Sequence, residues 1–233
     1  LNNYLNIEIP VGELNYFNNP FVSPGSFDMP IYQLASEGSN SDLNVYYGFW
    51  VLGAGQLGTR ERNSAFGHKS MYSGTEGDDN SLFGYKTAYD LTTGSRNVAV
   101  GSEALTNLDT GTDNVAIGRQ ALEQTTGYSE QVAVGARAGR AAVSAQSGVY
   151  VGFESGLNIS TGDHNTSVGY KTLESLQSGS ENTAIGYRAL GSTTTNGSTA
   201  VGYLASRNLT TGSANTSLGN SALMTITSSA SNT

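Results

Sequence analysis

Few side chains in this sequence have the types and spacing that chemistry requires. The two histidines, His68 and His164, are far apart in the chain and lack a partner at metal-ligand spacing, so we expect both on the surface. Carboxylates cluster at Glu76, Asp78 and Asp79, and Asp163 precedes His164. Oxygen ligands of this kind suit calcium, but neither group has the spacing of a known calcium loop. We therefore expect solvated turn residues and no metal site.

Other catalytic patterns are equally weak. Gly-Ala-Gly-Gln-Leu-Gly at 53–58 resembles a dinucleotide-binding loop, but no helix or acidic residue follows in a strand-helix-strand setting. The 19 acidic residues are spread along the chain and nominate no carboxylate pair for glycan hydrolysis. The chain has no cysteine, which excludes thiolate chemistry. The sequence thus predicts no catalytic residue, no cofactor and no enzyme.

Composition narrows the class of protein. The net charge of −8 argues against nucleic acid or an anionic membrane as a partner, because both require clustered Lys and Arg. No apolar run is long enough for a membrane span, so we expect no membrane insertion. Thirty glycines and only 13% charged residues are typical of a β-rich extracellular or virion protein.

The element that organises the chain is a short repeat with a glycine at a fixed place, here called the marker glycine. Each step is 17 residues except one of 16, between Gly186 and Gly202. A short fixed period predicts a parallel β-solenoid or β-roll of about ten coils, all-β in class. The marker glycines are Gly67, Gly84, Gly101, Gly118, Gly135, Gly152, Gly169, Gly186, Gly202 and Gly219.

Reading the repeat in columns predicts a strand before each marker glycine. The residue directly before the glycine is always apolar, as in Ile117 and Ile185, and we expect that column in the core. The residue two before it is mostly Ala or Ser, and we expect this small face to pack closely against another subunit. Tyr150 and Leu82 are the exceptions. Leu often stands four residues after the glycine, where we expect a second short strand.

A repeated Asn precedes the strand in most coils. Gly and Asn reach positive φ at low cost, so we expect a turn in which the Asn amides stack from coil to coil and fix the register. The residues given this structural role, together with five marker glycines, are Asn97, Asn114, Asn165, Asn182, Asn215, Gly101, Gly118, Gly169, Gly186 and Gly219.

One outward column is the candidate for contact with a partner. Aromatic residues follow several marker glycines directly, and charged residues stand next to them. Such rows bind glycans or proteins, although they also serve to shield the rod or to pack against a neighbouring subunit. Threonines form a column in the later coils only, which does not match an ice-binding array. The candidate partner-facing residues are Tyr85, Phe153, Tyr170, Tyr187, Arg188 and Tyr203.

The boundaries follow from where the period begins and ends. Residues 1–60 lack it and hold all four prolines and the one Trp, which predicts an irregular β cap or connector. Residues 61–226 form the repeat, and 227–233 form a tail. Each coil buries few aliphatic side chains against its conformational entropy. We therefore expect self-association, most simply of three rods about one axis.

At these residues the sequence resembles the YadA-like head repeat of trimeric adhesins and similar repeats of phage tail fibres. The resemblance covers about residues 63–223 and rests on Asn-Thr-Ala-Ile-Gly at 182–186, Val-Ala-Val-Gly at 98–101 and Val-Ala-Ile-Gly at 115–118. It implies a left-handed parallel β-roll in a homotrimer. The family repeat is commonly shorter, so the coil here implies a longer outer turn.

The expected function is that of a non-enzymatic rod in a trimeric fibre, of the phage tail-fibre or receptor-binding type, which recognises a host glycan or protein receptor. The expected location is a virion tail or a cell surface. The alternatives are a bacterial adhesin head, a subunit of an end-to-end extracellular filament and, less favoured, a glycan-hydrolysing tail spike. These expectations rest on analogy with the fold.

Overall fold

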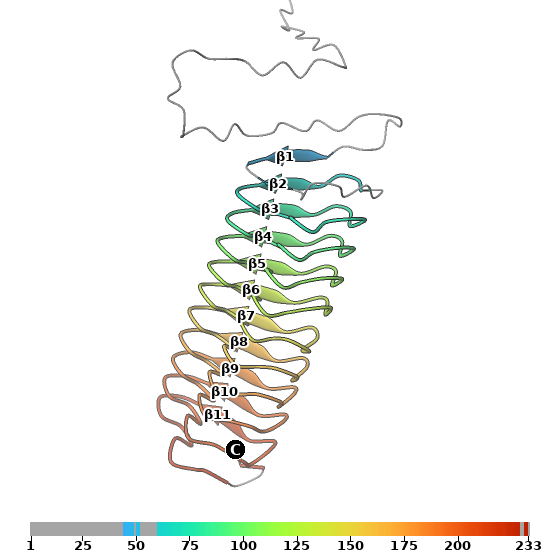
Figure 1. Ribbon diagram of the computed structural model, residues 1–233. Coiled ribbons are helices and arrows are strands. Elements are labelled where there is room, and N and C mark those ends of the chain that lie inside the picture. Colours follow the sequence, from blue (N-terminus) through green and yellow to red (C-terminus); the bar gives the residue numbers. More distant parts are fainter. Residues whose placement is uncertain (1–43, 49, 52–59, 229–230, 233) are drawn as a thin grey trace, which may run out of the picture.

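The computed structural model describes residues 44–48, 50–51, 60–228 and 231–232. Their one regular element is an eleven-stranded parallel sheet in which each strand is three residues long and pairs with the strands before and after it in sequence. Figure 1 shows the coils stacked as a rod, with one strand in each coil. No residue of these ranges is helical. The strands are β1 (Val45–Tyr47), β2 (Ser64–Phe66), β3 (Ser81–Phe83), β4 (Val98–Val100), β5 (Val115–Ile117), β6 (Val132–Val134), β7 (Val149–Val151), β8 (Thr166–Val168), β9 (Thr183–Ile185), β10 (Thr199–Val201) and β11 (Thr216–Leu218).

The repeat fixes the register of the sheet. Each residue pairs with its counterpart one repeat later, so that Val98 lies beside Val115 and Ala99 beside Ala116. The one 16-residue repeat does not shift the register of the sheet, because Thr183 in β9 still pairs with Thr199 in β10. The expected all-β parallel solenoid is therefore confirmed.

The expected inside and outside of the strands are wrong. The small residue two before the marker glycine points into the coil and is fully buried, as at Ala99 and Ala116. The apolar residue directly before the glycine points out of the coil, and Ile117 is 39% exposed. The small-residue face is therefore the inner wall of the coil and not a surface for another subunit.

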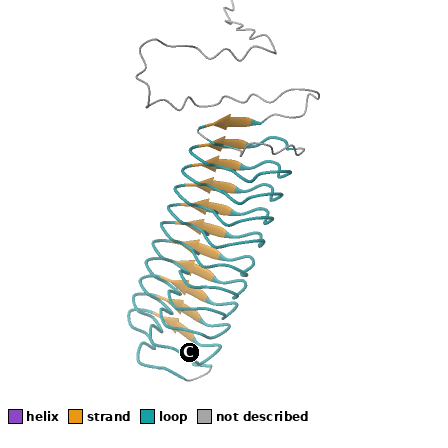
Figure 2. Ribbon diagram, in the orientation of Figure 1, coloured by secondary structure: helices purple, strands orange, loops and turns teal. Residues whose placement is uncertain are grey.

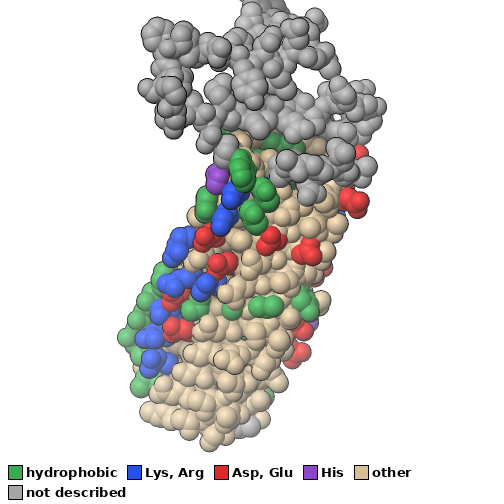
Figure 3. Space-filling view, viewed as in Figure 1, with side chains coloured by type: hydrophobic (Ala, Val, Ile, Leu, Met, Phe, Trp, Pro, Cys, Tyr) green, Lys and Arg blue, Asp and Glu red, His purple; other side chains and the backbone are tan. Residues whose placement is uncertain are grey.

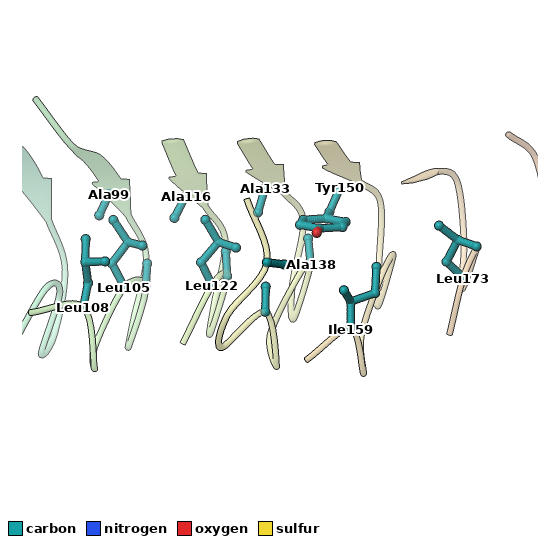
Figure 4. Packing of buried hydrophobic residues seen from close by; sticks show 14 of the residues in the cluster. Ala99, Leu105, Leu108, Ala116, Leu122, Ala133, Ala138, Tyr150, Ile159 and Leu173 are labelled. Atoms are coloured by element: carbon teal, nitrogen blue, oxygen red, sulfur yellow. The ribbon is translucent and has the colours of Figure 1, made fainter. Parts of the chain in front are cut away.

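Leucines from the rest of the coil explain this inversion. Leu105 and Leu122, four residues after their marker glycines, are fully buried. Leu108, three residues after Leu105, is fully buried too. Figure 4 shows these side chains filling the interior opposite Ala99 and Ala116. Because the leucines occupy the interior, only a small side chain fits on the strand side.

The second strand expected at these leucines is absent from the described coils. Leu105, Leu122, Leu173 and Leu190 have φ between 49° and 53°, in the left-handed region. That region turns the chain instead of extending it. Backbone hydrogen bonds still join the coils here, as from Leu105 N to Ala121 O at 3.1 Å. Figure 2 shows loops in place of a second strand.

The marker glycines are needed for close backbone approach. Gly118 has a φ of 131°, and a Cβ on it would lie 2.5 Å from Gly135 O and 2.6 Å from Gly135 C. No side chain fits there without moving the next coil. The same contact recurs between successive marker glycines along the stack.

Tyr46, Leu82 and Tyr150 depart from the small inner column, and Tyr150 shows how tightly the interior is filled. Tyr150 is fully buried inside the stack, where most coils have Ala or Ser. Three glycines make room for it: a Cβ on Gly139, Gly148 or Gly156 would lie within 2.5 Å of the Tyr150 side chain. Gly139 and Gly156 stand where most other coils place Leu, and Gly148 stands where most others place Asn.

The sheet extends beyond the predicted boundaries of the repeat. β1 lies within the segment predicted as a cap and pairs in register with β2. Residues 1–43, 49 and 52–59 of that segment, with all four prolines and most of the aromatics, lie outside the described residues. At the other end, Asn232 in the predicted tail donates its N–H to Asn215 Oδ1 at 2.9 Å and so continues the Asn column.

Candidate functional site

The Asn column forms a buried ladder along the rod. Asn97 Oδ1 accepts hydrogen bonds from Asn114 N and Asn114 Nδ2 at 3.1 and 3.0 Å. Asn97 Nδ2 in turn donates to Asn80 Oδ1 and Gly111 O at 3.1 and 2.9 Å. Asn165 and Asn182 repeat the pattern. Every polar atom of these amides is occupied within the chain, so the ladder is structural and offers nothing to a ligand.

The candidate partner-facing residues separate into a continuous column and one isolated member. Phe153, Tyr170, Tyr187 and Tyr203 stack coil upon coil, with ring centroids 5.5, 5.1 and 5.1 Å apart and planes within 12° of parallel. All four are exposed. Tyr85 lies several coils away and stacks instead on His68 at 5.5 Å. We call the four-residue stack the aromatic column.

The stacking limits what the aromatic column can bind. Because each ring covers the face of the next, Tyr170 and Tyr187 present only ring edges and hydroxyl groups to solvent. Sugars bind aromatic residues through the ring face, so these two rings do not form a sugar platform. The column is suited to hydrogen bonding along its hydroxyl row, and its role as a partner surface remains a prediction.

A chain of ion pairs runs beside the aromatic column. Arg137 and Lys171 both pair with Glu154, Lys171 also pairs with Glu174 at 2.8 Å, and Arg188 pairs with Glu174 at 3.2 Å. The carboxylates hold the pKa of Lys171 above its usual value, mainly through the hydrogen bond to Glu174. Glu154 is buried beneath the cations. Arg188, the charged candidate, is therefore tied into the rod on one side and half-buried.

The remaining chemical candidates do not come together. Asp78 accepts a hydrogen bond from Glu61 N at 2.7 Å, and Asp79 pairs with Arg62. Asp163 accepts a hydrogen bond from Gln146 N at 2.9 Å. Among the described residues no group of three His, Asp or Glu side chains is arranged to hold a metal ion. The Gly-rich stretch at 53–58 lies outside the described residues.

The structure adds a surface that the sequence columns did not predict. The two outward positions of each strand form a continuous face, here called the sheet face, and the position directly before the marker glycine is apolar in every strand from β2 to β11. Phe83, Val100, Ile117 and Ile185 are all exposed on it, although they belong to the column expected in the core. In β4 to β7 the other outward position is Val, and in β8 to β11 it is Thr. The signal for this face was the apolar column itself, assigned to the wrong side of the strand.

The size of the sheet face is unusual for a lone subunit. Exposed apolar residues on monomers are normally scattered, and a large contiguous patch marks an interaction site. Here the apolar side chains follow one another in register over at least eight strands, from Phe66 to Ile185. No helix in the described part of the chain is long and apolar enough to cross a membrane.

Comparison with known proteins adds no assignment. No family model, no curated protein and no solved structure matches the chain.

Proposed function

We propose that this chain is a non-enzymatic rod of a trimeric attachment fibre, in which three copies bury their sheet faces around a common axis. The exposed apolar sheet face is the observation that carries the proposal. Burying apolar area yields roughly 25 cal/mol per Å², and an aligned row of Val, Ile and Phe along the rod supplies that area in a form that a straight copy of itself can match.

The resemblance to YadA-like heads and tail-fibre repeats supports three copies and a left-handed coil. It also supports the attachment role, with a phage tail fibre or receptor-binding protein ahead of a bacterial adhesin head. An extracellular location, on a virion tail or a cell surface, belongs to the same proposal. The receptor is a glycan or protein of the host.

The oligomeric state tests the structural half of the proposal. We expect sedimentation equilibrium of the chain to give three times the monomer mass. Val115→Lys combined with Ile117→Lys places charges on the sheet face in β5, and this variant should sediment as a folded monomer. Asn107→Lys combined with Thr126→Lys adds the same charge at exposed turn positions and should leave the trimer intact. A wild-type chain that stays monomeric at all concentrations would overturn the proposal.

Binding and turnover test the other half. A fluorescently labelled trimer should bind host cells or their isolated surface glycans without shortening the glycan chains. Release of reducing ends from the glycan would instead establish the tail-spike alternative. Absence of binding to every surface tested, with long polymers visible by electron microscopy, would favour the filament.

A further inference from the structure

Two columns of mostly charged residues run along the two edges that flank the sheet face. Each strand enters the face just after one charged position and leaves it just before another. We call the residues five before the marker glycines the entry edge and the residues two after them the exit edge. The entry edge is formed by Arg62, Asp79, Arg96, Asp113, Glu130, Ser147, His164 and Glu181, and the exit edge by Lys69, Lys86, Glu103, Gln120, Arg137, Glu154, Lys171 and Arg188.

Ion pairs within the chain stay on one edge. Arg62 pairs with Asp79 and Arg96 with Asp113 along the entry edge. The pairs of Arg137, Lys171 and Arg188 all lie beside the exit edge. In the part of the chain that the structure describes, no ion pair joins one edge to the other. Figure 3 shows Lys and Arg gathered along one flank of the rod and mainly Asp and Glu along the other.

A closed ring of rods brings these edges together. This step rests on the proposed trimer. If the sheet faces point toward a common axis, the exit edge of each copy faces the entry edge of the next, which is a heterologous contact. Going once around the ring must return to the starting copy without a shift along the axis. Each coil therefore faces the same coil of its neighbour, to within less than one coil.

The pattern of charges selects the same-coil register independently of that symmetry argument. In this register four of the five pairs of charged residues have opposite signs, and only Lys69 faces a like charge, at Arg62. In one pair the signs are reversed: Glu103 on the exit edge meets Arg96 on the entry edge, whereas in the other three the exit edge carries the cation. The four opposite-charge pairs are Lys86 with Asp79, Glu103 with Arg96, Arg137 with Glu130, and Arg188 with Glu181.

Shifting one copy by a single coil loses this agreement. When each exit-edge residue faces the entry edge of the following coil, two pairs attract and two repel. The attracting pairs are Lys69 with Asp79 and Lys171 with Glu181, and the repelling pairs are Lys86 with Arg96 and Glu103 with Asp113. A shift in the other direction leaves one attracting pair, Arg137 with Asp113, against three repelling pairs: Lys86 with Arg62, Glu103 with Asp79, and Glu154 with Glu130.

We propose that the exit edge of each copy docks against the entry edge of a second copy of this chain, coil against the same coil, and that these charge pairs set the register of the fibre. A second copy can reach the entry-edge side chains, because Asp79, Arg96, Glu130 and Glu181 are all exposed, including the two that also pair along their own edge. Exposed pairs contribute little to affinity but discriminate between registers, since a like-charge contact is unfavourable. The sheet face supplies the association, and the edges supply its alignment.

Charge reversal at one coil tests the inference. Glu181 is exposed, so Glu181→Arg should leave the monomer folded while placing a cation opposite Arg188 at all three contacts. We expect the concentration at which half of the chains are trimeric to rise by about tenfold or more at low salt. The shift should shrink at high salt because exposed charges are screened.

A second reversal provides rescue and a matched control. Glu181→Arg combined with Arg188→Glu restores opposite charges in the same coil and should return the midpoint to within about twofold of wild type. Glu130→Arg combined with Arg188→Glu makes the same exchange in mismatched coils and should weaken the trimer further. Because Arg188 also pairs with Glu174, the melting of each variant is followed by circular dichroism at concentrations where it is monomeric.

The outcomes separate this inference from the proposed function. A wild-type trimer whose midpoint is unchanged by Glu181→Arg, or a mismatched double variant that recovers as well as the matched one, would overturn the edge contact and leave the trimer standing. A wild-type chain that never associates would overturn both. If Arg188→Glu does not fold, the salt-dependent effect of Glu181→Arg alone still decides the question.

Discussion

Replacing Asn97 by Ala removes one member of the buried amide ladder and should destabilise the rod strongly. The side chain makes four hydrogen bonds within the chain, two accepted at Oδ1 and two donated from Nδ2. Its loss leaves three groups without these partners: the Asn114 N–H, one Asn114 Nδ2–H and the Gly111 carbonyl. Asn80 Oδ1 keeps the hydrogen bond from the Asn97 backbone N–H at 3.0 Å.

The size of the effect follows from those three groups. An unsatisfied buried polar group costs about 1–3 kcal/mol, which bounds the loss between about 3 and 9 kcal/mol. A water molecule that enters the space left by the amide would satisfy part of this, so we expect about 3–5 kcal/mol. Asn97→Ser should lose less, because Ser198 occupies the same column and its Oγ accepts from Asn215 N at 3.3 Å.

Urea unfolding followed by far-ultraviolet circular dichroism measures this loss. The matched control is Asn107→Ala, which makes the same change at an exposed turn position and should alter the free energy of unfolding by less than about 0.5 kcal/mol. All chains are compared at one concentration, because association shifts apparent stability. If the free energies of unfolding of Asn97→Ala and Asn107→Ala differ by less than about 1 kcal/mol, the ladder does not stabilise the rod and the reasoning is refuted.

Three further predictions concern stability. Tyr150→Phe should match or exceed the stability of wild type in urea, because the buried Tyr150 hydroxyl has no hydrogen-bond partner in the described chain. Tyr150→Ala should instead lower the free energy of unfolding by about 3–5 kcal/mol. A destabilised Phe variant would show that the hydroxyl has a partner and would contradict this prediction. Gly118→Ala should cost more than about 3 kcal/mol, because it combines a left-handed φ with a contact of 2.5 Å to Gly135 O, while Gly127→Ala, which meets only the Thr110 hydroxyl, should melt near wild type. Burial raises the pKa of Glu174, but hydrogen bonds from Lys171 and Arg188 lower it by more, so the folded pKa lies below the unfolded value. The ionised Glu174 therefore stabilises the fold above its unfolded pKa, and this stabilisation is lost as pH falls. Glu174→Gln should flatten the fall in melting temperature between about pH 5 and pH 3. An unchanged slope of melting temperature against pH would contradict this prediction.

The repeat itself was predictable from the sequence because its period appears directly in the marker glycines. The parallel sheet and its register followed, since a fixed period places each strand beside its own copy. The Asn column was also accessible: a repeated amide next to a turn has few uses in a buried position other than bonding to its counterpart in the next coil.

The sequence did not show in the same way which face of each strand points into the core. In a strand of three residues, alternation shows that Ala116 and Ile117 lie on opposite faces, but both are apolar and either suits an interior. What decides between them is the volume already filled by Leu105, Leu122 and their counterparts. Those leucines were expected to begin a second strand. Because Leu rarely adopts left-handed φ, the sequence offered no sign that the chain turns there and directs them inward.

Tyr150 shows how the inside and outside could have been recognised. Around it, Gly148 replaces the usual Asn, and Gly139 and Gly156 replace the usual Leu. A large side chain that coincides with three lost side chains indicates that all four share one closed space of fixed volume. Because Tyr150 belongs to the small column, that column must be interior. The apolar residues beside it are then left outside, where the proposed trimer would bury them.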